Sequence, residues 1–192
     1  MKKTLYMMRH GETLFNLRHK IQGACDSPLT ENGIAQAKKV ANYVRTLDID
    51  HAYSSSAERA SDTLEYAIEN RLPYTRLKAL KEMNFGNFEG ESEDLNPQRG
   101  PAFENFFVPF GGESRQQVQE RMLNTLTAIM EKEDHLNVFV VSHAGATMGF
   151  VAQWHIIDEV LPNRLPNGTI LKWSYENKIF NLEEVIYQDQ HD

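Results

Sequence analysis

Residues 5–16 read Leu5-Tyr6-Met7-Met8-Arg9-His10-Gly11-Glu12-Thr13-Leu14-Phe15-Asn16, and the expected fold is built outward from this segment. It opens with four apolar residues, which are too few for a helix and are typical of a buried strand. The apolar run stops at Arg9, His10 and Gly11, where a strand would leave its sheet. In open α/β sheets, ligands bind just outside the carboxyl ends of the strands. The segment therefore predicts a strand that ends at a binding site.

The three residues at this strand end suit an anionic ligand. Arg9 carries a rigid fork of donors that matches phosphate oxygens. The neutral ring of His10 has a nitrogen that can attack phosphorus. Gly11 lacks a Cβ, so the backbone can approach a ligand closely. An Arg-His-Gly triplet alone is also typical of an ordinary strand end on the surface, and the rest of the chain must decide between the two interpretations.

Composition predicts a single globular domain spanning residues 1–192. The hydrophobic fraction of 41% and the charged fraction of 24% are ordinary for such a domain. The net charge of −7 argues against binding to nucleic acid or to a membrane surface. One cysteine, Cys25, excludes an internal disulfide and fits a reducing compartment. We therefore expect a cytoplasmic protein, either a monomer or a homo-oligomer.

Hydrophobic periodicity and capping residues predict alternating strands and helices. Strands are expected at 5–8, 51–55, 73–77, 138–141, 168–175 and 179–187, and helices at 30–47, 56–68, 114–130 and 146–157. The polar tail at 189–192 is expected to fray. This alternation predicts a three-layer α/β/α fold with a mostly parallel sheet of about six strands.

One stretch, at about 83–112, departs from this alternation. It is rich in Gly and Pro and contains six of the ten phenylalanines, namely Phe85, Phe88, Phe103, Phe106, Phe107 and Phe110. A long, turn-rich aromatic insertion is typical of a lid or pocket wall. A satellite hydrophobic cluster that packs on the main core explains the same composition equally well.

Positive groups recur where the predicted strands end. The first strand delivers Arg9 and His10, the second is followed by Arg59 in the first turn of a helix, and the strand at 138–141 is followed by His143. The carboxyl ends of parallel strands lie on one edge of a sheet, so these four side chains should converge. A cluster of positive charge in an otherwise acidic protein is what a phosphoryl group requires.

Several separated motifs in this chain resemble the histidine phosphatase superfamily, whose best-known branch is the cofactor-dependent phosphoglycerate mutases. They are Arg9-His10-Gly11-Glu12 with Asn16, Ser27-Pro28-Leu29-Thr30 with Gly33, Ser55-Ser56 with Arg59-Ala60, Glu82, and Ser142-His143-Ala144-Gly145. The resemblance extends from residue 5 to about residue 150 in the order of the family. It implies phosphoryl transfer through a phosphohistidine.

The resemblance also implies a role for each matching residue. His10 would be the nucleophile, Glu82 the general acid, and Arg9, Arg59 and His143 would hold the phosphoryl oxygens. Further groups would bind or border the phosphoryl group: Gly11, Asn16, Gln22, Gly23 and Ala144. Glu12, Glu89 and Glu91 lie near enough in sequence to remain alternatives to Glu82.

The remaining chemistry-bearing residues are interpreted as structural. His19, His51, His135, His155 and His191 fall in predicted loops, at a helix end or in the tail, where surface or capping roles are usual. No metal-binding motif is present, so we expect neither a metal nor another cofactor. A cysteine phosphatase would carry an arginine six residues after Cys25, and that residue is Glu31.

Three functions remain open, and we favour the first. They are a phosphatase acting on a small phosphorylated metabolite, a phosphoglycerate mutase-type enzyme, and a non-catalytic phosphate-binding module. Only about thirty residues separate Glu82 from Ser114, and their charges are mainly acidic: Glu89, Glu91, Glu93, Asp94 and Glu104 against Arg99. Such a segment neutralises a bisphosphorylated substrate poorly. By resemblance, the mutase branch has a threonine at the position of Gln22, and a glutamine there resembles the phosphatase branch.

Overall fold

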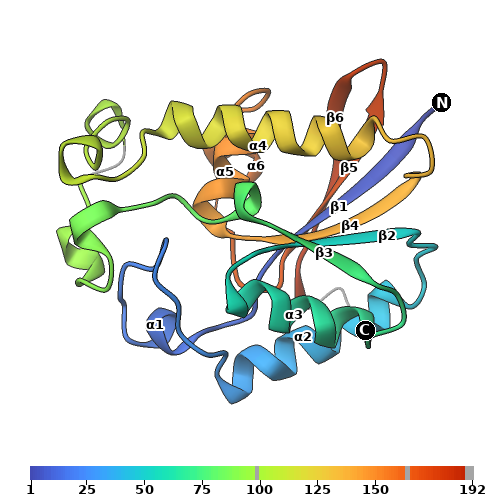
Figure 1. The fold of residues 1–192 in the computed structure, drawn as a ribbon, viewed down its shortest axis with the longest axis horizontal. Helices are drawn as coiled ribbons and strands as arrows, with labels where there is room; N and C mark the ends of the chain where they lie inside the picture. The colour runs from blue at the N-terminus through green and yellow to red at the C-terminus, as the bar shows by residue number, and fades with distance from the viewer. Residues whose placement is uncertain (98–99, 163–164, 189–192) are drawn as a thin grey trace.

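The computed structural model describes residues 1–97, 100–162 and 165–188 and has the three-layer α/β/α architecture expected (Figure 1). Its sheet has six strands in the order β3-β2-β4-β1-β5-β6. The strands are β1 (Lys3–Arg9), β2 (His51–Ser55), β3 (Tyr74–Leu77), β4 (Asn137–Ser142), β5 (Ile170–Glu176) and β6 (Ile179–Ile186). Arg99 and the tail at 189–192 lie outside the described residues.

Strand direction and register bring three strand ends to one edge of the sheet. Strands β1 to β4 run parallel to one another, whereas β5 is antiparallel to β1, and β6 to β5. Arg9 at the end of β1 is level with Ser142 of β4, and Ser54 of β2 is level with Val141 of β4. The predicted mostly parallel sheet is therefore confirmed.

Helices cover both faces of the sheet. Figure 1 shows α2 (Glu31–Val44) and α3 (Glu58–Ile68) on one side, and α4 (Arg115–Met130) and α5 (Ala144–Val151) on the other. Successive strand side chains point to opposite faces, so β1 contributes Leu5 and Met7 to one core cluster, and Tyr6 and Met8 to the other. All four side chains are buried, which makes β1 a central strand.

Helix starts follow the capping residues in the sequence. The side chain of Thr30 accepts a 3.0 Å hydrogen bond from the backbone N–H of Gly33. At the start of α4, Ser114 and Gln117 form a reciprocal capping box, with bonds of 3.1 and 2.8 Å. Each such cap stabilises its helix by about 1 kcal/mol. The predicted starts of these two helices are confirmed.

The helix after β4 differs from the prediction. It was expected over 146–157, but α5 spans Ala144–Val151, and a separate short helix, α6, spans Ile157–Val160. Helix α5 starts two residues earlier than expected because a carboxylate distant in sequence caps it, as described below. Two smaller differences concern α3, which begins at Glu58 rather than at residue 56, and a four-residue helix, α1 (Leu14–Leu17), which was not expected.

The segment between β3 and α4 is built from short 3₁₀ helices: η1 (Lys78–Leu80), η2 (Gly86–Phe88), η3 (Glu93–Leu95), η4 (Pro101–Phe103) and η5 (Val108–Phe110). Phe107 is fully buried at its centre, with ring centroids 4.9 Å from Phe85 and 5.0 Å from Phe106. Phe107 belongs to the main core, whereas Phe85 and Phe103 line the cavity described below. The aromatic segment is thus both a core extension and a pocket wall.

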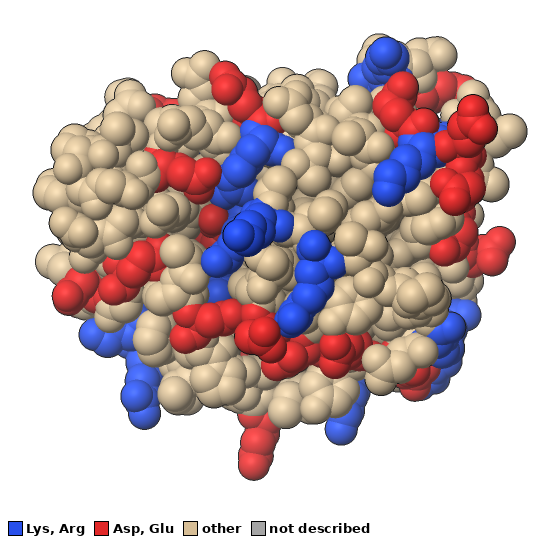
Figure 2. Space-filling model, in the orientation of Figure 1, with Lys and Arg blue, Asp and Glu red and all other residues tan. Residues whose placement is uncertain are grey.

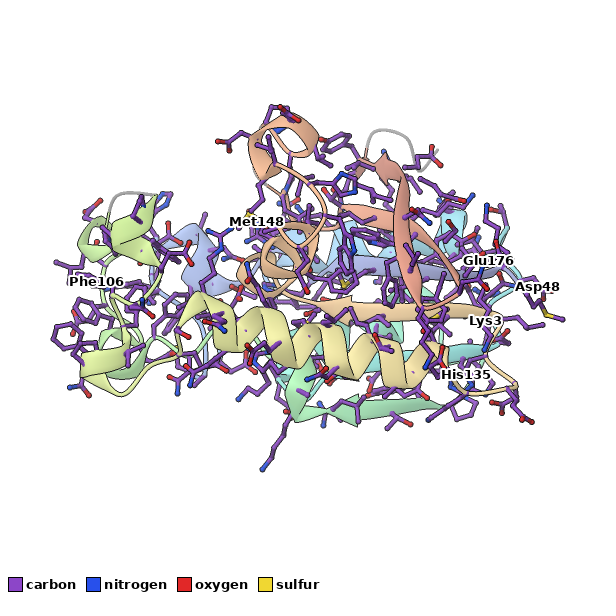
Figure 3. The ribbon with its side chains drawn as sticks, turned by 90° about the horizontal axis from the view of Figure 1, so that it is seen from above. Lys3, Asp48, Phe106, His135, Met148 and Glu176 are labelled. Atoms are coloured by element: carbon purple, nitrogen blue, oxygen red, sulfur yellow. The ribbon has the colours of Figure 1, made fainter. Side chains whose placement is uncertain are left out.

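Figure 3 places Phe106 at one end of the molecule and His135 near the other, with Met148 of α5 between them. In the described part of the chain, no helix combines the length and the apolarity needed to cross a bilayer.

Candidate active site

A cavity of about 850 Å³ opens at the carboxyl edge of the sheet. The end of β1, loop residues 19–22, the aromatic segment, α4 and α5 all contribute to its wall. Six of the residues predicted to form the site line it: Arg9, His10, Asn16, Gln22, Glu82 and Ala144. The other four, Gly11, Gly23, Arg59 and His143, are not part of its lining. Arg59 and His143 are fully buried and lie beside His10, as shown below.

His10 presents one ring nitrogen to the cavity. Its Nδ1 lies 2.7 Å from the carbonyl oxygen of Gly11, and a carbonyl only accepts, so Nδ1 carries the hydrogen. The lone pair of a neutral ring is then on Nε2, the atom that can attack phosphorus. Burial, with the charges of Arg59 and Arg9, holds the pKa of His10 well below its ordinary value. The ring is therefore neutral at physiological pH and ready to act as a nucleophile.

His143 lies beside His10, with 5.1 Å between ring centroids in an edge-to-face arrangement. Its Nε2 is 2.7 Å from Oγ of Ser55. Burial and the charge of Arg59 hold the pKa of His143 well below the usual value. Its Nδ1 is buried and has no hydrogen-bond partner among the described residues.

Arg59 is clamped by the loop at 22–26. Nη1 donates to the carbonyl of Cys25 at 3.0 Å and to Oδ1 of Asp26 at 2.8 Å. Nη2 donates to the carbonyls of Gln22 and Gly23 at 3.3 and 3.1 Å. Nε, by contrast, is buried and finds no acceptor within the described chain. Nε of Arg59 and Nδ1 of His143 are thus two buried polar atoms without a partner in the described chain, on residues close enough to His10 to lower its pKa or to contact its ring.

The loop before β5 holds the side chain of Arg9 and the backbone of His10 in place, and the sequence did not indicate it. Nη1 of Arg9 donates to the carbonyl of Leu165 at 2.5 Å. Nδ2 of Asn167 donates to the carbonyl of His10 at 2.9 Å and to Oδ1 of Asn16 at 3.3 Å. An asparagine in a turn more than 150 residues from His10 carries no local signal of such a contact.

Asn16 and Gln22 are oriented by neighbouring hydroxyl and backbone groups. Oδ1 of Asn16 accepts from the backbone N–H of Thr13 at 3.2 Å and from Asn167. Its amino group is therefore the end available to a ligand. Gln22 accepts from the Thr13 hydroxyl at 2.7 Å and donates to Oγ of Ser27 at 3.0 Å, so both ends of its amide hold the loop together.

Glu82 links the aromatic segment to the start of α5. Oε1 accepts from the backbone N–H groups of Met83 and Ala146, at 2.8 and 2.7 Å. Oε2 accepts one bond, from Gly145 at 2.8 Å. A carboxylate oxygen has two acceptor sites, so Oε2 retains one that none of the described hydrogen bonds occupies. This contact is also the reason that α5 begins at Ala144.

The three glutamates that were alternatives to Glu82 as the general acid lie in different surroundings. The carboxylate of Glu89 accepts four backbone N–H bonds of 2.8–3.0 Å, from Gly23, Ala24, Cys25 and Phe85. Burial alone would raise the pKa of Glu89, but hydrogen bonds with the Cys25 side chain and with these backbone groups hold it below the ordinary value, so Glu89 is an ionised support of the loop. Glu12 bonds the Thr30 hydroxyl at 2.6 Å, and Glu91 is exposed. Among these four glutamates, Glu82 alone lines the cavity.

Two glycines predicted to approach the ligand have other contacts. A Cβ on Gly11 would lie 2.5 Å from the carbonyl oxygen of Gly33, and a Cβ on Gly23 would lie 2.0 Å from that of Met83. Both distances are impossible for real side chains. These glycines permit close packing of backbone on backbone, which keeps the loops around His10 compact.

One of the remaining histidines, His135, differs from the prediction, because it is buried with Nε2 bonded to the Tyr53 hydroxyl at 2.6 Å. His19 is an exposed turn residue, as expected, and both His19 and His155 also border the cavity. Burial raises the pKa of Cys25 to about 11, so it is a protonated thiol, as expected of a structural residue. His191 lies outside the described residues.

Within the described ranges, the residues grouped closely enough to hold a metal are His51, Asp134 and His135. Figure 3 places His135 of this group at the other end of the molecule from Phe106. The two imidazole rings are stacked at 3.6 Å, so their nitrogens do not point at a common centre. His135 is already bonded to Asp134 and Tyr53. The expected absence of a bound metal stays a prediction.

The fold and this site together define an α/β protein that gathers Arg9, Arg59, His10 and His143 at the carboxyl edge of its sheet, beside a cavity. Comparison with known proteins agrees, because the family model described as histidine phosphatase superfamily (branch 1) matches residues 5–187. This chain belongs to that superfamily.

Two curated relatives have different activities in their names. Over 168 residues, the chain is 31% identical to the adenosylcobalamin/alpha-ribazole phosphatase of Salmonella typhimurium, covering 79% of this chain and 83% of the relative. Over 151 residues, it is 32% identical to a probable phosphoglycerate mutase, GpmB, of Erwinia tasmaniensis, covering 74% and 70%.

Solved structures match almost the whole chain. YhfR of Bacillus stearothermophilus superposes with a TM-score of 0.83 at 28% identity, covering 93% of this chain and 94% of that one. The phosphoserine phosphatase of Entamoeba histolytica, solved with 3-phosphoglyceric acid, has a TM-score of 0.79 at 26% identity, covering 98% of each chain.

Proposed function

We propose that this protein is a phosphatase that hydrolyses small phosphomonoesters through a phosphohistidine on His10. The observation that carries the proposal is the state of the His10 ring, which is neutral, held through Nδ1 by Gly11, and beside two buried polar atoms that lack partners. Phosphoryl transfer needs positioning and charge neutralisation above all, and these residues supply both.

In the first step, Nε2 of His10 forms a bond to phosphorus while the ester P–O bond breaks. Arg9, Arg59 and His143 stabilise the charge on the phosphoryl oxygens, and Asn16 and the backbone of Ala144 bind the same group. Glu82 gives the proton on Oε2 to the leaving oxygen, which departs as an alcohol. In the second step, the Glu82 carboxylate takes a proton from water, the resulting hydroxide attacks phosphorus, and the P–N bond breaks to release inorganic phosphate.

The wall of the cavity supports a small metabolite as the substrate. It combines apolar side chains, such as Phe85 and Met148, with the cations Lys20 and Arg115 and with Glu93 and Asp94. Figure 2 shows Lys and Arg side chains near the middle of one face, interrupted by Asp and Glu. A surface of mixed charge does not favour nucleic acid, and such a partner is not proposed.

A mutase is the second candidate, because Lys20 and Arg115 at the cavity would suit a second anionic group on the substrate. One experiment separates the two functions. The enzyme is supplied with 3-phosphoglycerate and the bisphosphorylated primer, and both inorganic phosphate and 2-phosphoglycerate are followed. Phosphate release from several monoesters with negligible isomerisation supports the phosphatase, whereas efficient isomerisation with little phosphate released overturns it.

A further inference from the structure

The contact between His143 and Ser55 bears on which ring nitrogen of His143 carries the hydrogen. Because the ring is neutral, only one nitrogen is protonated. Nε2 faces the Ser55 hydroxyl at 2.7 Å, whereas Nδ1 is buried with no partner among the described residues. The tautomer decides whether Nδ1 presents a hydrogen-bond donor or a lone pair to a bound anion.

The hydrogen bonds around Ser55 favour one of the two tautomers of the His143 ring. Its Oγ already accepts a 3.2 Å hydrogen bond from the backbone N–H of Ala57, at the turn that leads into α3. The hydroxyl still has one hydrogen to donate. Ring Nε2 of His143 is the acceptor that the structure places beside it.

The opposite tautomer leaves two defects in a buried region. If Nε2 carried the hydrogen and donated it to Ser55, the hydroxyl hydrogen would have no acceptor among the described contacts of Ser55. Nδ1 would then present a lone pair beside the anion-binding groups. Unsatisfied buried polar groups each cost free energy, and a lone pair repels phosphoryl oxygens.

We propose that Ser55 is a positioning residue that donates its hydroxyl hydrogen to Nε2 of His143 and so places the ring hydrogen on Nδ1, as a donor to the phosphoryl group. This inference rests on the proposed function for its consequence in catalysis. The tautomer itself is a property of the free protein and can be measured whether or not the protein is a phosphatase.

The test uses ¹⁵N-histidine-labelled protein at pH 7.5, in which protonated and unprotonated ring nitrogens resonate far apart. The His143 signals are assigned by their loss in His143→Gln. We expect the parent protein to carry the hydrogen on Nδ1. A His143 ring with its hydrogen on Nε2 would overturn the proposal, without recourse to any variant of Ser55.

A pair of variants then tests the role of the hydroxyl. Ser55→Ala removes it, whereas the matched control, Ser54→Ala, removes an equally buried hydroxyl from the same strand, one that bonds Ser61 at 3.2 Å rather than His143. In Ser55→Ala we expect the Nδ1–H preference to weaken and kcat/KM to fall by roughly 10- to 100-fold, by analogy with the loss of a hydrogen-bond partner that orients a metal-binding histidine. Ser54→Ala should keep the parent tautomer and nearly the parent kcat/KM.

Three outcomes are distinguishable. An unchanged His143 tautomer and unchanged kcat/KM in Ser55→Ala would overturn the positioning role. Equal losses in both variants, with the tautomer intact, would show that Ser55 is structural only. A parent protein with the predicted tautomer but no turnover of any phosphomonoester would leave this inference standing and remove the proposed function.

Discussion

Arg59 is fully buried and donates a 2.8 Å hydrogen bond from Nη1 to Oδ1 of Asp26. The other oxygen of Asp26 accepts the backbone N–H of Glu58 at 2.6 Å, at the start of α3. One carboxylate therefore joins the loop at 22–26 to the helix that carries Arg59. This contact gives the guanidinium beside His10 a single orientation.

Asp26→Asn should weaken both stability and turnover. The amide has one oxygen, so its NH₂ group would face either Arg59 or the N–H of Glu58 and repel it. We expect the free energy of unfolding to fall by about 1.5–3 kcal/mol, the range for a hydrogen bond to a charged group, and kcat to fall as well. Denaturant unfolding and steady-state kinetics check this. A matched control is Glu69→Gln, which alters an exposed ion pair with Arg45 and should leave kcat unchanged.

The rings of His10 and His143 should remain neutral under mildly acidic conditions. Burial and nearby arginines lower the pKa of both groups, so the folded protein binds protons there only well below the usual histidine pKa of about 6.5. By linkage, their contribution to stability is complete above about pH 6.5 and declines as the pH falls. NMR titration of the ring C–H signals of the free protein checks this, and a His10 signal that titrates near pH 6.5 would contradict it.

Glu82→Gln should impair substrates according to their leaving groups. A general acid contributes about 10²- to 10⁴-fold, so alkyl phosphates should lose at least about 100-fold in kcat/KM. Nitrophenyl phosphate, whose leaving group needs no proton, should lose much less. The variant also weakens the cap of α5, but that defect is the same for every substrate. The ratio of the kcat/KM losses for the two substrates therefore isolates the effect of proton donation by Glu82. Equal losses for both substrates would assign the acid to another residue.

The reaction should need no divalent ion and should be inhibited by vanadate. Arg9 and Arg59 supply the positive charge that Mg²⁺ provides in other phosphoryl-transfer enzymes, and the neutral rings of His10 and His143 add a nucleophile and a hydrogen-bond donor. Vanadate can mimic a five-coordinate transition state. Dialysis against a chelator should leave kcat unchanged. Activity that is lost on dialysis and restored by a divalent ion would show that the four side chains are not sufficient.

Much of the fold could be predicted because its signals are local. The apolar runs of β1 and β4 stop at Arg9 and His143, and the parallel register between them is the ordinary outcome of alternating strands and helices. Thr30 and Ser114 cap helices through bonds to residues three positions away. The convergence of His10, Arg59 and His143 follows from these elements alone.

The contacts that were missed join residues far apart in sequence. Asn167 bonds the carbonyl of His10, and Glu82 caps α5 across more than 60 residues. Capping by a distant carboxylate explains why a helix prediction based on periodicity placed the start of α5 too late. His135 was interpreted as a surface residue because its burial depends on Tyr53, which lies on a strand rather than nearby in the sequence.

The role of His10 as the nucleophile is the central claim, and a covalent label tests it most directly. A turnover reaction is quenched in alkali, where phosphohistidine survives, and the acid-labile phosphate is located by mass spectrometry. We expect the phosphate on His10. His10→Ala should carry no label and lose nearly all turnover, with thermal unfolding close to that of the parent. Phosphate on His143 or Cys25, with none on His10, would contradict the account.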